Sequence, residues 1–85
     1  MSAYREQRYA DALEAVRAAL EHMPDHAGLH YNNACFATLA GDTGDDTFAH
    51  LRRSVELRPR FREDPRRDDD LAAARDDQRF GQALR

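Results

Sequence analysis

Apolar residues recur at helical spacing in the N-terminal part of the chain. Between Arg8 and Met23 the large apolar positions follow one another at intervals of four, three and four, with alanines on the same side. These positions are Tyr9, Leu13, Val16 and Leu20, flanked by Ala12, Ala15 and Ala19. Because Pro24 disfavours helical backbone at the residue before it, this helix is expected to end near His22.

A second helix is predicted after the proline. It begins near Ala27, with Asp25 as its N-cap, and it breaks at Gly41, where a polar loop follows over residues 41–46. Its large apolar residues are Leu29, Phe36 and Leu39. The pattern therefore predicts a pair of helices joined by a short turn.

A third helix is predicted from about residue 47 to 57, capped by Asp45 or Asp46 and ended by Pro59. Its apolar stripe consists of Phe48, Leu51 and Val55. Beyond the proline the chain is dense in charge and few apolar anchors remain. These anchors are Phe61, Leu71, Phe80 and Leu84. The whole pattern predicts an all-α fold, with three main helices followed by short C-terminal helices.

Composition narrows the class of protein. Eighty-five residues with 41% apolar and 34% charged side chains make one small domain, and fifteen alanines against four glycines favour helix. A single cysteine excludes an intramolecular disulfide framework. Neither a membrane-spanning apolar run nor a signal-peptide core is found, so we expect a cytoplasmic protein that does not bind membranes.

Charge is distributed unevenly along the chain. All thirteen basic residues are arginines, and the net charge of −3 argues against nucleic-acid binding, which depends on neutralising phosphates. Residues 1–48 hold three arginines and eight acids, a net charge of −5, whereas residues 49–85 hold ten arginines and eight acids, a net charge of +2.

The chain also contains an internal repeat. When it is shifted by 35 residues, eight of the thirteen positions from 12 to 24 meet a residue that is identical or similar in kind. The pattern is a small residue, an apolar one four later, a small one three further on, and then a proline. Small residues let one helix approach its neighbour closely, and the proline turns the chain into the next helix.

This order of residues resembles the tetratricopeptide (TPR) repeat. The residues that match its second helix are Ala12, Val16, Ala19 and Pro24 and, in weaker form, Thr47, Leu51, Ser54 and Pro59. The sequence Tyr-Asn-Asn-Ala-Cys at 31–35 and the tail 69–80 are similar to segments common in bacterial TPR proteins. The resemblance implies antiparallel helix hairpins, with a half repeat at 1–26, a full repeat at 27–60 and a C-terminal cap at 61–85.

The half repeat lacks its first helix, of which only residues 3–6 could be a remnant. Stacked repeats need neighbours to bury their apolar faces, so the stripe of the first helix is expected to be open on one side. Either a longer parent protein or a second copy of the chain would cover it. We therefore predict a homodimer through the first helix, with Tyr4 and Tyr9 near the contact.

The resemblance implies a non-catalytic protein–protein interaction module that binds a peptide or a partner protein. The residues facing its groove would be Gly28, Tyr31, Asn32, Cys35 and Thr38, to which Arg52 is added from the arginine-rich part of the chain. In the family, an asparagine at the place of Asn32 often bonds the bound peptide. A local hydrogen bond across the helix pair remains an equal alternative for this residue.

Other groups could carry chemistry, although each has a plainer explanation. His22, His26 and His30 are spaced by four, but Pro24 lies between the first two, so they do not share a helix and are expected to cap and pack. Cys35 has no base near it in sequence and is expected to be a buried thiol. We therefore expect no catalytic residue, no cofactor and no metal, although a small enzyme or metal protein remains the alternative class.

Two charged clusters complete the candidates. The run Asp68–Asp69–Asp70 lacks the spacing of a calcium loop and is expected to cap a helix. Seven arginines could bind phosphate or carboxylate groups, and nearby acids are expected to neutralise them. The arginines are Arg52, Arg53, Arg58, Arg60, Arg62, Arg66 and Arg67, and the acids are Glu56, Glu63, Asp64 and Asp68–Asp70.

Overall fold

The computed structural model describes the backbone of residues 3–85 and the side chains from Gln7 onward. It is all-α over this range, as predicted, with three long helices followed by short ones. The long helices are α1 (Ala3–His22), α2 (Ala27–Leu39) and α3 (Asp45–Leu57). The short ones are the 3-10 helices η1 (Pro59–Arg62), η2 (Asp64–Arg66) and η3 (Asp69–Ala74), and the α-helix α4 (Gln78–Ala83). No helix in this range is both long and apolar enough to cross a bilayer.

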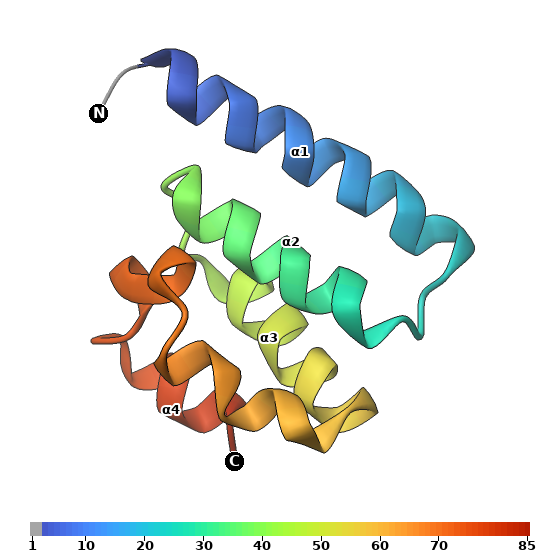
Figure 1. Cartoon of the computed structure of the whole chain (residues 1–85), viewed down its shortest axis with the longest axis vertical. Helices are drawn as coiled ribbons and strands as arrows, with labels where there is room; N and C mark the ends of the chain where they lie inside the picture. The colour runs from blue at the N-terminus through green and yellow to red at the C-terminus, as the bar shows by residue number, and fades with distance from the viewer. Residues whose placement is uncertain (1–2) are drawn as a thin grey trace.

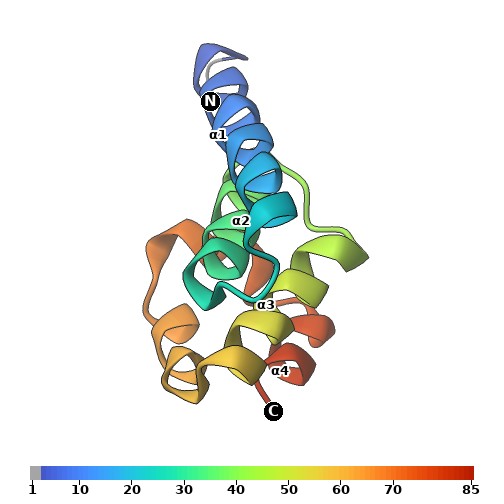
Figure 2. The ribbon, with the colours of Figure 1, turned by 90° about the vertical axis from the view of Figure 1, so that its right-hand side faces the viewer.

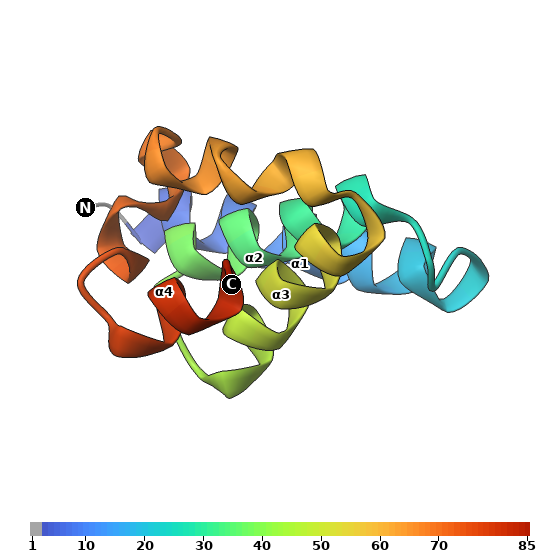
Figure 3. The same cartoon turned by 90° about the horizontal axis from the view of Figure 1, so that it is seen from below.

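The three long helices stack in chain order, with neighbouring helices running in opposite directions (Figure 1). α2 is the central element, because α1, α3 and η3 all pack against it. The N-terminal end of α1 projects beyond the other helices (Figure 2). The segment from η1 to η3 curves past α2 and α3, and α4 lies against α3 (Figure 3).

α1 corrects one expectation about the repeat. Residues 3–6 form the first turn of this continuous helix, so they are not the remnant of a separate preceding helix. The helix ends at His22, as the following proline predicts. Its stripe is buried within the single chain, since Leu13, Val16 and Leu20 are at most 9% exposed and α1 packs on α2. The rest of the surface from which the homodimer was predicted is less covered, since Tyr9, Ala12 and Ala19 are half-buried and Ala15 is exposed. The side chain of Tyr4 lies outside the described residues.

α2 begins and ends where predicted, but a different residue caps it. The N-cap is His26, whose Nδ1 accepts a hydrogen bond from the backbone N–H of Leu29 at 3.1 Å. Asp25 instead pairs with Arg53, at 3.0 Å. At the other end Gly41 has a φ of +88°, a left-handed conformation that glycine adopts without a steric penalty and that ends the helix.

The buried face of α2 does not consist of its large apolar residues. Leu29, Phe36 and Leu39 are only half-buried. The buried residues are small or polar, namely Ala27, His30, Asn33, Ala34, Cys35, Ala37 and Thr38. Because α2 is packed between several elements, small side chains there allow each neighbour to approach closely.

α3 starts slightly earlier than predicted. Gly44 is its N-cap and makes no side-chain capping bond, so neither Asp45 nor Asp46 is the cap. Both acids lie in the first turn, where negative charge interacts favourably with the helix dipole. The predicted stripe of Phe48, Leu51 and Val55 is buried.

The C-terminal segment completes the hydrophobic core. Leu71 is 0% exposed, and Phe80 and Leu84 are also buried against the stripe of α3. The predicted anchor Phe61 is only half-buried. Arg79 ties the end of the chain to the start of α3, since its guanidinium donates to Asp45 at 2.7 Å and lies over the Phe48 ring. Residues 69–84 are therefore an integral part of the fold.

Candidate functional site

The residues predicted to line a peptide groove do not share one open surface. Cys35 and Thr38 are buried and Tyr31 is half-buried, on a helix against which η3 packs. Asn32 is exposed on α2. Arg52 is exposed on α3, where it lies 4.0 Å from Glu56. The chain's own C-terminal segment thus takes up part of the face that the resemblance assigned to a ligand.

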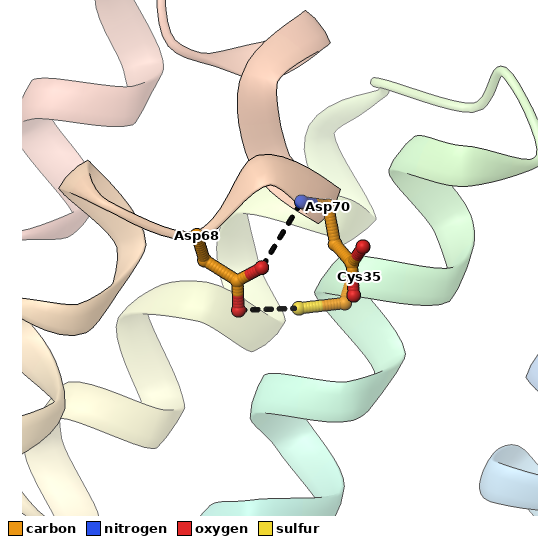
Figure 4. A group of neighbouring side chains, drawn as sticks. All are labelled: Cys35, Asp68 and Asp70. Carbon is orange, nitrogen blue, oxygen red and sulfur yellow. Dashed lines mark hydrogen bonds between the residues drawn. The ribbon is translucent and has the colours of Figure 1, made fainter.

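A cluster of polar side chains joins α2 to this segment (Figure 4). The hydroxyl of Tyr31 donates to Asp68 Oδ2 at 2.8 Å, and the thiol of Cys35 lies 4.0 Å from the same oxygen. The other oxygen of Asp68 accepts from the backbone N–H of Asp70 at 3.0 Å and so caps η3, as expected for this acidic run. The guanidinium of Arg75 donates to the backbone carbonyl of Asp68 and so stabilises the start of η3.

Burial and negative charge keep the donors of this cluster protonated. Desolvation, followed by the effect of the Asp68 carboxylate, raises the pKa of Cys35 to about 12, although the neighbouring Tyr31 opposes this shift. Desolvation also raises the pKa of Tyr31, and its hydrogen bond to Asp68 adds to the effect. At neutral pH the thiol is therefore not a nucleophile. The sequence-based expectation of a buried thiol is confirmed.

The same cluster contains the only three closely spaced metal-ligating residues among those described. Ligand atoms of Cys35, Asp68 and Asp70 lie within 4.8 Å of one another. However, Asp68 already accepts from Tyr31 and from the η3 backbone, and a metal would have to displace the thiol proton at Cys35. The geometry is that of a structural contact between α2 and the C-terminal segment.

Sequence reasoning missed a histidine pair. His30 on α2 meets His50 on α3, with their Nδ1 atoms 2.9 Å apart, and His30 Nε2 lies 2.6 Å from the carbonyl oxygen of Pro24. Since a carbonyl only accepts, Nε2 of His30 carries a proton, and in the neutral pair His50 donates to Nδ1 of His30. His30 thus does pack, as expected. Nothing in the sequence indicated its partner, which is twenty residues away.

The arginine-rich segment is less neutralised than expected. Only Arg52 and Arg53 of the seven arginines form ion pairs with described residues. The other five are exposed and have no carboxylate within ion-pair distance among the side chains described, those of residues 7–85, namely Arg58, Arg60, Arg62, Arg66 and Arg67. We call these five residues the arginine surface. It leaves several positive charges available to a partner.

No family model, curated protein or solved structure matches this chain. The resemblance to TPR repeats therefore depends on the sequence motifs alone.

Proposed function

We propose that this protein is a non-catalytic protein-interaction module whose binding surface is the arginine surface. The supporting observation is that five exposed arginines within residues 58–67 lack a carboxylate partner among the described residues. Arginines without internal partners remain free to form bidentate bonds with acceptors on another molecule, and arginine is enriched at protein interfaces.

The thiol and three of the four histidines are engaged in holding the fold together. The thiol of Cys35 is protonated and buried beneath Asp68. His30 and His50 bond each other, and His26 caps α2. A general base or nucleophile needs a side chain that is free to reach a substrate, and these side chains serve internal contacts instead.

We also propose that the long helices have a TPR-type arrangement. The antiparallel stacking of α1, α2 and α3 supports this, as does the complete burial of Ala34 at a small-residue position of the repeat. In this chain, however, part of the face usually left for a ligand is covered by η3, so the binding surface we propose lies on the C-terminal side of α3.

Selection from a random-peptide phage library against the immobilised chain tests the proposed function. We expect a set of related peptides that bind the free protein in calorimetry, and whose affinity falls in a variant carrying Arg60→Gln and Arg62→Gln. The matched control carries Arg8→Gln and Arg17→Gln, which remove two exposed charges from α1. Failure to enrich any related peptides, or equal affinity for all three proteins, would contradict the proposal.

A further inference from the structure

Two members of the arginine surface gather around one aromatic ring. The guanidinium carbon of Arg58 lies 5.7 Å from the centroid of Phe61, and that of Arg60 lies 6.0 Å from it. The Phe61 ring also contacts Tyr31, with 5.4 Å between centroids. The ring is therefore held in place from α2, and it holds two otherwise unpaired cations at one point of the surface.

A hollow of about 320 Å³ opens beside this group, between the N-terminus of α2 and the end of α3. Arg58 and Phe61 line it, together with His26 and Asp25. Because Nδ1 of His26 accepts from the backbone of α2, the proton of its neutral ring sits on Nε2, which can donate. Asp25 is the one carboxylate in the lining, and Arg53 pairs with it at 3.0 Å.

Donors predominate around the hollow. The Arg58 guanidinium and the imidazole N–H of His26 line it, and Arg60 lies beside it at the ring. The one acid of the lining is exposed and forms an ion pair with Arg53. The apolar part of the lining comes from Phe61, Leu57 and Ala27. A ligand that fits here has a carboxylate for the arginines and a short apolar stem for the ring.

We propose that Arg58, Arg60 and Phe61, with the adjoining hollow, bind a glutamate- or aspartate-rich segment of a partner protein. This inference rests on the proposed function and names the chemistry of its partner. A carboxylate would replace water as the acceptor for the two guanidiniums, and the acidic side chain's methylene groups would contact the Phe61 ring.

The size of the hollow favours an acidic peptide over a nucleic acid. At about 320 Å³ it is at the small end of ligand sites, which suits one or two side chains. A larger hollow of about 440 Å³ next to Arg66 fits less well, because the guanidinium of Arg75 there already donates to the backbone carbonyls of Pro65 and Asp68.

Fluorescence anisotropy with a short fluorescein-labelled polyglutamate peptide tests the inference. We expect saturable binding that weakens as salt is raised. Binding should weaken roughly tenfold or more in a variant carrying Arg58→Gln and Arg60→Gln, since this variant loses two charge-assisted contacts to carboxylates. The Arg8→Gln, Arg17→Gln control should bind as the wild type does, and circular dichroism should show the same helix content in all three.

Three results would overturn the inference. One is the absence of polyglutamate binding, and another is equal binding to both arginine variants. The third is tighter binding of a labelled single-stranded polythymidine that also depends on Arg58 and Arg60, which would assign the site to nucleic acid. If polyglutamate fails while the phage library yields related non-acidic peptides, the interaction module stands and only its acidic partner is refuted.

Discussion

The bond between His30 and His50 makes the stability of this protein depend on pH in a definite direction. The neutral pair is fully bonded, because His30 donates to Pro24 and accepts from His50. One further proton can enter at the outer nitrogen of His50 without disturbing the bond. A second proton would place two N–H groups against each other across 2.9 Å and break the contact between α2 and α3.

The magnitude follows from the protons bound in the folded and unfolded states. Burial lowers the pKa of His50 below its ordinary value of 6.5, with His30 and Arg17 adding to the effect and Asp46 opposing it. Below about pH 6.5 the unfolded chain therefore binds more protons than the folded chain, so the free energy of unfolding decreases as pH falls. The expected slope is at most about 1.4 kcal/mol per pH unit for His50, until it is protonated in the folded state.

Urea unfolding followed by helical circular dichroism, at intervals between about pH 7 and pH 5, measures this slope above the range where most carboxylates titrate. The variant His50→Gln keeps an amide donor for His30 but cannot take up a proton. We expect it to have a flatter profile than the wild type over this range. His22→Gln, which replaces an exposed histidine at the end of α1, is the control and should follow the wild-type profile.

The reasoning is refuted if the wild-type free energy of unfolding does not change over this pH range. It is also refuted if His50→Gln loses stability as steeply as the wild type. A decrease shared equally by His22→Gln and the wild type, and absent from His50→Gln, would assign the effect to the pair.

Four further predictions concern packing and the buried cluster. Leu71→Ala should lower the free energy of unfolding by about 2–5 kcal/mol in urea titrations, and half-buried Leu39→Ala by clearly less; equal losses would mean that the C-terminal segment is not part of the core. Cys35 should react with iodoacetamide far more slowly in the native protein than in urea at mildly alkaline pH, because burial and the Asp68 carboxylate raise its pKa to about 12. Tyr31→Phe should lower the free energy of unfolding by roughly 0.5–1.5 kcal/mol, because it removes the hydroxyl that donates to Asp68. Ala19→Leu should lower the free energy of unfolding by about 1–3 kcal/mol, because a larger side chain would overpack the helix that lies against α2. An unchanged melting midpoint would mean that this half-buried position is not part of the contact between the two helices.

The sequence by itself determined the helices and most of their ends. Pro24, Gly41 and Pro59 act on the backbone next to them, so their effect does not depend on the rest of the fold. The stripes of α1 and α3 were equally readable, because a 3.6-residue period places large apolar residues on one side. Local signals of this kind are sufficient to establish an all-α chain.

The caps were less predictable, since several neighbouring residues could accept a hydrogen bond from the same backbone N–H groups. His26 caps α2 because Asp25 is drawn into an ion pair with Arg53, which lies on another helix. Which acceptor is free for capping therefore depends on contacts that the local sequence does not contain.

Only the tertiary structure decided what covers each surface. Periodicity shows that a helix has a buried face, but α2 is enclosed by three elements, so its small and polar residues are inside while Leu29 and Phe36 are only half-buried. The bonds from His30 to His50 and from Tyr31 to Asp68 join residues 20 and 37 positions apart. Whether an arginine forms an ion pair likewise depends on distances in space, and among the described side chains none of the acids beside the arginine surface in sequence lies within ion-pair distance of it.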